Sequence, residues 1–167
     1  YIGLEPHNWV TAWVAITDAN ENNGCMRMWP GSHKNNLKHH NQKFDANNLL
    51  TRGQTIENVP IKETEPVILK AGQMSLHHPT IVHGSGINKS NDRRIGFVVQ
   101  SYIGDNVNQV LGKMFVQLAR GKDRYKYHQY SNIPEEFMNI KDIECRDIAN
   151  EELSKIFYNG SKKIGKY

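Results

Sequence analysis

The sequence predicts a mainly β protein: a sandwich or barrel of antiparallel strands followed by a helical C-terminal region. Three observations support this fold class. Short runs rich in β-branched and aromatic residues fill the first part of the chain, turn-forming residues separate them, and apolar residues at helical spacing recur towards the end. A chain of 167 residues, 38% of them hydrophobic and 23% charged, is long enough for one folded domain with a core.

The first two predicted strands lie on either side of a dense turn signal. "VTAWVAI" (10–16) is rich in β-branched and aromatic residues, and "DANENNG" (18–24) consists largely of turn formers. "CMRMW" (25–29) is the next strand, and "PGSH" (30–33) stops it. We expect the two strands to form a hairpin, with Cys25 packed in the core.

A long polar connection follows at 34–65, and its first part has no clear period. A connection of this length inside a compact domain is usually functional, often as a lid over a site. A disordered surface loop is the alternative, and the sequence favours neither. We expect His39 and His40 to be exposed, and His33 to order the turn before the connection.

Three more strands are predicted after this connection: "PVILKAGQMSLHH" (66–78), in which Gly72 marks a turn, "TIVHGSG" (80–86) and "RRIGFVVQSYI" (93–103). Closely spaced short strands with turns between them are typical of an antiparallel sandwich or barrel.

The last two of these strands are predicted to pair as a hairpin. In that ladder His83 lies opposite Arg94, with Cβ atoms about 5 Å apart, and Ser85 shares their face because side chains alternate along a strand. Imidazole is a good ligand for iron, zinc or copper, and the arginine fork suits a carboxylate. The spacing therefore predicts a metal on His83 and a small dicarboxylate that reaches Arg94. Ordinary surface or core roles are the alternative.

Helices are predicted for the last third of the chain. "NQVLGKMFVQLARG" (108–121) has apolar residues at the spacing of an amphipathic helix. Pro134 can begin a second helical stretch, which Gly160 ends. No internal repeat and no second domain is indicated, so we expect 1–167 to form a single domain.

Composition and charge exclude several classes of partner. No apolar run approaches the roughly 20 residues that span a bilayer, and no signal segment opens the chain. The net charge is +4 and the pI about 9.0, but the densest basic patch, "SKKIGKY" (161–167), is expected to be a solvated end. We therefore expect neither nucleic acid nor membrane as a partner.

Cys25 and Cys145 have no metal or disulfide spacing, which favours reduced thiols in a cytoplasmic protein.

Two stretches resemble signatures of the phytanoyl-CoA dioxygenase family. "VTAWVAITDANENNGCMRMWPGSHK" (10–34) has the tryptophan strand, the Asn-rich turn, "NGC" and "PGSH". "LHHPTIVHGSGINKSNDRRIGF" (76–97) has "HGS", a following Asn and a later Arg. "NNLLTRGQ" (47–54) and "LARGKDRYKYH" (118–128) also resemble segments of bacterial members, and the abundance of Asn, Lys and Ile favours a bacterial source.

The resemblance implies a double-stranded β-helix, a jelly-roll of the cupin-like kind, that uses Fe(II), 2-oxoglutarate and O₂. Its strands would lie in 1–103, with a long connection at 34–65 and a mostly helical region at 104–167. The implied reaction is oxidation of a small organic substrate or an acyl-CoA, most commonly by hydroxylation.

The resemblance also implies roles for individual residues. His83 would be the distal iron ligand, and Arg94, helped by Ser85, would hold the far carboxylate of 2-oxoglutarate. Trp13 would line the cosubstrate pocket, and Asn88 would shape the loop after "HGS".

The sequence departs from the family pattern at the metal. The family binds iron through two histidines and one carboxylate, and the proximal pair is a His-x-Asp motif upstream of the tryptophan strand. No such motif occurs here, since His7 is followed by Asn8 and Trp9. We therefore expect the chain to be the C-terminal part of a longer oxygenase, incomplete at its N-terminus and inactive alone.

Alternatives stay open for the activity and for one histidine. A halogenase of the same fold, with Ala or Gly in place of the ligand carboxylate, is one alternative to hydroxylation. A non-catalytic jelly-roll that binds a carboxylate through Arg94 is another. His78 precedes a proline as in the family, and it is either a pocket residue or a structural histidine. The substrate and the oligomeric state are not predicted.

Overall fold

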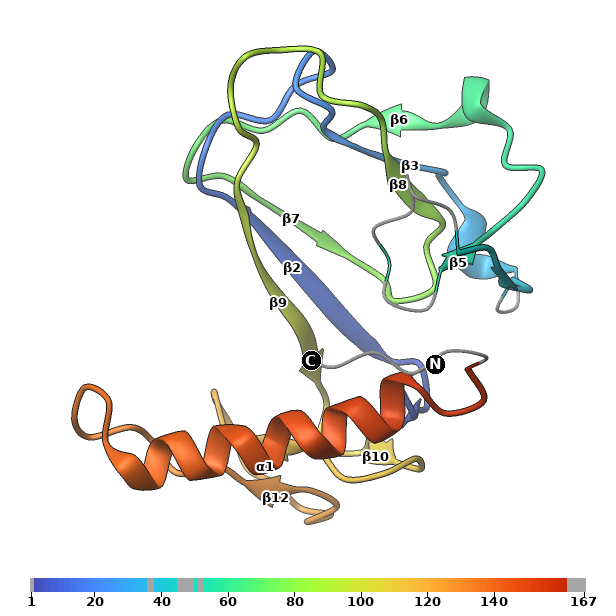
Figure 1. Ribbon diagram of the computed structural model, residues 1–167. Helices are drawn as coiled ribbons and strands as arrows, with labels where there is room; N and C mark the ends of the chain where they lie inside the picture. Colours follow the sequence, from blue (N-terminus) through green and yellow to red (C-terminus); the bar gives the residue numbers. More distant parts are fainter. Residues whose placement is uncertain (1, 36–37, 45–49, 51–52, 162–167) are drawn as a thin grey trace. The chain divides into compact units, whose positions relative to one another are not determined.

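The computed structural model describes residues 2–35, 38–44, 50 and 53–161 (Figure 1). The chain folds as two compact units. The sheet unit comprises Asn8–Asn41 and Thr55–Ile103, and the helix unit comprises Tyr1–His7, Gln42–Gln54 and Gly104–Tyr167. All the predicted site residues belong to the sheet unit. The prediction that 1–167 is one oxygenase domain stays a prediction.

Some predictions fall on residues outside the described part of the chain. These are the solvated tail, apart from Ser161, and most of the segment 47–54. Parts of the connection at 34–65 lie outside it too, so its role as a lid or a disordered loop stays untested. Its described parts include η1 (Ser32–Lys34), β4 (Asn41–Gln42), β5 (Gln54–Thr55) and η2 (Ile61–Glu63). His39 is exposed, as predicted, whereas His40 is half-buried.

The first sheet of the sheet unit has the strand order β7–β2–β9 (Figure 1). Its strands are β2 (Trp9–Ala15), β7 (Met74–His77) and β9 (Gly96–Ile103), all antiparallel to their neighbours. Trp13 of the central strand pairs with Ser75 on one side and Val98 on the other, and Thr11 pairs with His77. Because side chains alternate, these five residues share one face of the sheet.

The second sheet has the strand order β6–β3–β8. Its strands are β3 (Met26–Met28), β6 (Glu65–Pro66) and β8 (His83–Ser85), again antiparallel. Met28 pairs with His83, and Met26 pairs with Ser85. These four side chains share a face, while Arg27 and Gly84 belong to the other.

Both predicted hairpins are wrong, because the strands concerned belong to different sheets. β2 and β3 do not pair, and neither do β8 and β9. The chain crosses between the sheets after β2, after β6, after β7 and after β8. This alternation is that of a double-stranded β-helix, so the predicted fold class is confirmed. Turn residues mark where a strand ends, but they do not specify which sheet receives the next one.

The core of the sheet unit lies beside the first sheet. Its buried cluster consists of Trp13, Ala15, Ala19 and Cys25. Cys25 is 2% exposed, which confirms its predicted place in the core. Burial raises the pKa of its thiol, so the group stays neutral and serves packing rather than reactivity.

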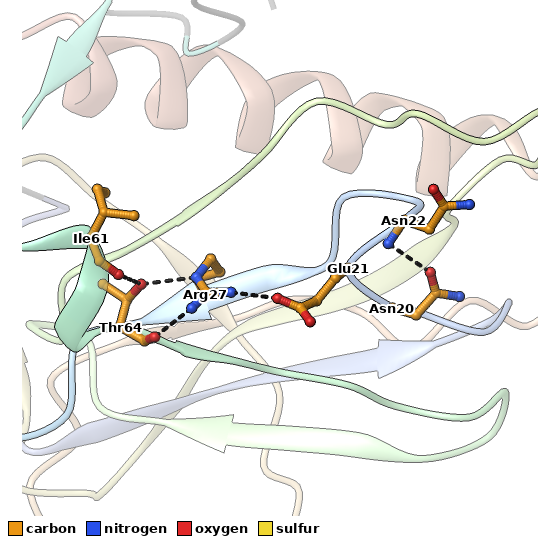
Figure 2. Close-up of polar contacts among 6 residues, drawn as sticks. All are labelled: Asn20, Glu21, Asn22, Arg27, Ile61 and Thr64. Carbon is orange, nitrogen blue, oxygen red and sulfur yellow. Dashed lines mark hydrogen bonds and ion pairs between the residues drawn. The ribbon is translucent and has the colours of Figure 1, made fainter.

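Figure 2 shows how Arg27 of β3 fastens the segment that precedes β6. Its Nε donates to Thr64 Oγ1 at 2.9 Å and its Nη2 to the Thr64 carbonyl at 2.6 Å. Its Nη1 forms an ion pair with Glu21 at 2.8 Å. Thr64 is buried, and its hydroxyl also donates to the Ile61 carbonyl at 2.7 Å, so the polar atoms of this residue are bonded from two sides. Arg27 is thus a structural residue of the face turned away from His83.

The helix unit combines short strands with one helix. β1 (Leu4–Glu5) pairs with β10 (Asn108–Gln109), and β11 (Phe115–Val116) pairs with β12 (Gln129–Tyr130). The helix α1 (Ile140–Phe157) begins after Asn139, whose side chain accepts from the Lys141 amide at 2.9 Å. The predicted second helical stretch is therefore confirmed in part, since it begins six residues after Pro134. No described helix is long and apolar enough to cross a bilayer.

The predicted helix at 108–121 is wrong. Asn108–Gln109 is a strand, and Gly112 has a φ of 66°, in the left-handed region that interrupts a right-handed helix. A Cβ at Gly112 would lie 2.5 Å from Cγ1 of Ile156, so the glycine backbone packs closely against α1. The expectation of a mostly helical region at 104–167 is thus met by α1 alone within the described residues.

Candidate functional site

Arg94 lies over the ring of Trp13 and beside Ser85. Its guanidinium carbon is 5.5 Å from the ring centre, and its Nη2 donates to Ser85 Oγ at 3.3 Å. Trp13 is buried and Arg94 is half-buried. The indole holds the guanidinium by a cation–π contact and leaves its other N–H groups available to an anion.

The ladder predicted between His83 and Arg94 does not exist. His83 pairs with Met28, and Arg94 precedes β9 in the other sheet. The predicted meeting of Arg94 with Ser85 nevertheless occurs, because the long arginine side chain reaches across to β8. The contact between Arg94 and Ser85 was therefore predicted, but from the wrong strand pairing.

Thr17 holds the backbone on both sides of Arg94, and sequence reasoning missed it. Its hydroxyl donates to the Arg93 carbonyl at 3.1 Å and accepts from the Ile95 amide at 2.9 Å. The Ile16 amide also donates to the Ile95 carbonyl at 3.0 Å. A threonine two residues after the end of β2 carries no distinctive signal in the sequence, so only the structure reveals this role.

No carboxylate of the described residues forms an ion pair with Arg94. The described ion pairs involve other cations, including Arg27 with Glu21 and Lys70 with Asp18. A half-buried guanidinium without a counter-ion is a favourable partner for an anionic ligand. It has already lost part of its hydration on folding, so binding the anion removes less water from it.

His83 and His77 form what we call the inner pair. Their ring centroids are 5.6 Å apart, so the faces of the two sheets that carry them look towards each other. His83 Nδ1 lies 2.9 Å from the Ile81 carbonyl, which can only accept. That bond places the proton on Nδ1 and leaves the lone pair on Nε2, the arrangement usual for a metal-binding histidine.

His77 contributes a second imidazole beside His83. It ends β7 and is half-buried, and its Nδ1 lies 3.5 Å from Ser75 Oγ. Burial first, and the neighbouring His83 second, lower the pKa of His77 below its ordinary value. Both effects favour the neutral form of the imidazole.

His78 and His33 form what we call the turn pair, with ring centroids 5.4 Å apart. Thr80 ties the two together, since its Oγ1 lies 2.8 Å from His78 Nδ1 and donates to the His33 carbonyl at 3.2 Å. This bonding is that of a structural turn. A pocket role for His78 stays a prediction.

The "PGSH" motif acts through Ser32, which sequence reasoning missed in favour of His33. Ser32 is 1% exposed, and its hydroxyl accepts from the Val82 amide at 2.9 Å and donates to the Trp29 carbonyl at 2.7 Å. The Trp29 amide in turn donates to the Val82 carbonyl at 2.9 Å. These bonds fix the residue immediately before His83. The presence of the "PGSH" motif was the sequence signal from which this role of Ser32 could have been inferred.

The two stretches that resemble the family signatures, 10–34 and 76–97, are in contact with each other. A Cβ at Gly24 would lie 2.7 Å from the Gly86 carbonyl oxygen, and Gly24 has a φ of 73°, so this position requires glycine. Asn88 orders the adjoining loop by donating to the Asp92 carbonyl at 2.7 Å and accepting from the Ser90 amide at 2.8 Å. The Asn-rich turn and the loop after "HGS" therefore form one contact.

Gly96 makes room for Trp13. A Cβ on Gly96 would lie 2.1 Å from Cζ2 of the indole, closer than any real contact. The ring under Arg94 therefore depends on a glycine in the neighbouring strand.

The candidate site contains one imidazole whose Nε2 could bind a metal and one guanidinium that could bind a carboxylate. Among the described residues, no group of three or more His, Cys, Asp or Glu side chains is arranged to hold a metal. The chemistry of these groups nevertheless fits a metal-chelating dicarboxylate. His83, with its Nε2 lone pair, suits the metal, and Arg94 with Ser85 suits the carboxylate at the other end of the ligand.

The profile of the family described as "Phytanoyl-CoA dioxygenase (PhyH)" matches residues 2–96, more than half of the chain. The chain belongs to the phytanoyl-CoA dioxygenase family. The match includes Trp13, His83, Ser85 and Arg94, and it ends at Gly96. The predicted resemblance is thereby confirmed.

Curated relatives of this family member differ in what their names say they act on. The human "Phytanoyl-CoA dioxygenase, peroxisomal" is 34% identical over 88 residues, covering 51% of this chain and 25% of the relative. A "Probable alpha-ketoglutarate-dependent hypophosphite dioxygenase" of Stutzerimonas stutzeri is 30% identical over 112 residues, covering 64% of this chain and 39% of the relative.

A solved structure supports the fold along nearly the whole chain. The "non-heme monooxygenase; ThoJ apo" superposes with a TM-score of 0.80 at 28% identity, covering 94% of this chain and 56% of that one. This family member therefore spans about half the length of that structure, and between a quarter and two fifths of the two curated relatives above.

Proposed function

We propose that the complete protein is an Fe(II)- and 2-oxoglutarate-dependent oxygenase of a small organic molecule. The observation that carries the proposal is Arg94, which lies over Trp13, contacts Ser85 and forms no ion pair with any described carboxylate. Family membership supports the same cosubstrate, and the name of the Stutzerimonas stutzeri relative includes it.

Each residue has a distinct task in this proposal. His83 would hold the metal through Nε2, because Ile81 engages Nδ1. Arg94 would bind the far carboxylate of 2-oxoglutarate, with the Ser85 hydroxyl as an additional donor, and Trp13 would shield that carboxylate from water. When bound, iron supplies the centre at which 2-oxoglutarate and O₂ react, with loss of CO₂ and oxidation of a C–H bond. The substrate and the choice of hydroxylation or halogenation do not follow from these residues.

The test uses the complete protein with Fe(II), labelled 2-oxoglutarate and air. We expect labelled CO₂ and succinate to form only when all three are present. Replacing Arg94 with Ala should weaken 2-oxoglutarate binding by about 10- to 100-fold, since it removes a charge-assisted bond to the ligand carboxylate. Arg120→Ala, an exposed arginine of the helix unit, is the control.

A carboxylate-binding module without iron is the second candidate. It is favoured by the lack of a three-ligand metal group among the described residues. Titration with Fe(II) separates the two candidates: binding of 2-oxoglutarate that is independent of metal, together with no release of CO₂, would support the module and contradict the oxygenase.

A further inference from the structure

His77 lies beside His83, the predicted metal ligand. It pairs with Thr11 at the edge of the β7–β2–β9 sheet and shares a face with Trp13 and Ser75. Its ring centroid is 5.6 Å from that of His83. If Arg94 and Ser85 take the far carboxylate, then the group that reaches His83 is the opposite, metal-chelating end of the ligand.

The partner of His77 Nδ1 differs from the partner of His83 Nδ1. His83 Nδ1 faces a backbone carbonyl, which fixes its proton there and leaves Nε2 as the electron-pair donor. His77 Nδ1 faces the hydroxyl of Ser75, which can donate to it. If the Ser75 hydroxyl donates to Nδ1, a ring proton lies on Nε2, for which no hydrogen-bond partner is found among the described residues.

We propose that His77 is a cosubstrate-binding residue whose Nε2–H donates to the metal-chelating carboxylate of 2-oxoglutarate. The inference rests on the proposed function and adds to it a third contact on the ligand, beside those of Arg94 and Ser85. A donor at this end of the dicarboxylate would fix how it approaches the metal, so His77 would govern the affinity and orientation of the cosubstrate rather than the affinity of the metal.

The test compares His77→Phe with wild type in the complete protein under anaerobic conditions. Phenylalanine keeps a planar ring and removes both nitrogen atoms, and His39→Phe, at an exposed position, is the matched control. Co(II) and Fe(II) affinities are measured first. The charge-transfer absorption that 2-oxoglutarate produces on bound Fe(II) then gives its dissociation constant.

We expect His77→Phe to weaken 2-oxoglutarate binding by about 10-fold, the loss typical of a hydrogen bond to a charged group, with metal affinity within about 2-fold of wild type. His77→Gln, which keeps an N–H donor, should recover part of the loss. Circular dichroism confirms that the variants are folded, and His77→Gln supplies the test if His77→Phe is not.

Two results would overturn the inference. Unchanged 2-oxoglutarate affinity in both variants would mean that His77 makes no contact with the cosubstrate. A loss of metal affinity as large as that of His83→Ala would mean that His77 is a ligand instead. Failure of the proposed function is distinct, because wild type itself would then produce no charge-transfer absorption with Fe(II) and 2-oxoglutarate.

Discussion

The inner pair and the turn pair are built from adjacent residues, His77 and His78, yet they have different surroundings. His77 lies beside His83, on the face that also carries Trp13. His78 packs on His33 and is bonded to Thr80. The difference shows that strand alternation and one turn, rather than residue type, decide which neighbours each of two adjacent histidines has.

The largest effect is expected at His83. His83→Ala in the complete protein should weaken Fe(II) or Co(II) binding by at least about 100-fold, more than the loss of a residue that only supports a ligand. Calorimetric titration measures the affinity. His78→Ala, from the turn pair, is the matched variant and should bind metal as wild type does. Equal losses in the two variants would break the distinction between the pairs.

Gly96 tests the packing of the Trp13 ring, over which Arg94 lies. Gly96→Ala forces a Cβ into the Trp13 ring, and such overpacking should lower the free energy of unfolding by about 1–3 kcal/mol. Urea denaturation measures the change, and 2-oxoglutarate affinity should fall with it because Arg94 lies on the displaced ring. Gly84→Ala is the control, since a Cβ there meets no atom within 4 Å.

Thr80 tests the turn pair. Thr80→Val keeps the shape of the side chain but removes the hydroxyl that contacts His78 and His33, so the free energy of unfolding should fall by about 1 kcal/mol. Metal affinity should be unchanged in the folded variant. A variant of normal stability that binds metal weakly would reverse the roles given to the two pairs.

The smallest effect is expected at Asp18, which belongs to neither pair. The bond from the Lys70 side chain, and next the bond from the Ala71 amide, lower the pKa of the Asp18 carboxyl. A carboxyl with a depressed pKa stabilises the fold above its unfolded value, and this contribution is lost as the pH falls through the folded value. Asp18→Asn should therefore be slightly less stable than wild type at pH 7, with the difference vanishing in acid well below the ordinary value of 3.8. Urea midpoints measured across this pH range check the sign.

For the sheet unit, the sequence predicted the family and the contact between Arg94 and Ser85, but not the pairing of the strands. Trp13, Ser85 and Arg94 do come together, and family membership was predicted from the two signatures that contain them. Their strand partners were wrong, because Met28, not Arg94, lies opposite His83. Pairing between strands far apart in the chain leaves no local pattern, whereas a turn between neighbouring strands does.

The helix unit shows a different limit of sequence prediction. The apolar spacing at 108–121 is helical, yet Gly112 has a positive φ and packs on Ile156. Tertiary packing overrode a local preference there. The supporting roles of Thr17 and Ser32 were also hidden, because a hydroxyl that bonds to a distant backbone amide looks like any other in the sequence.

The crossing of the chain between the two sheets has a consequence for folding speed. β2 is bonded to β7 and β9, which are both synthesised long after it, so large loops must close before its ladders form. High contact order of this kind slows folding relative to a helical bundle of equal length. Until β9 pairs with β2, Trp13 lacks one of its flanking strands, so the contact between Arg94 and the Trp13 ring is among the last that the sheet unit forms.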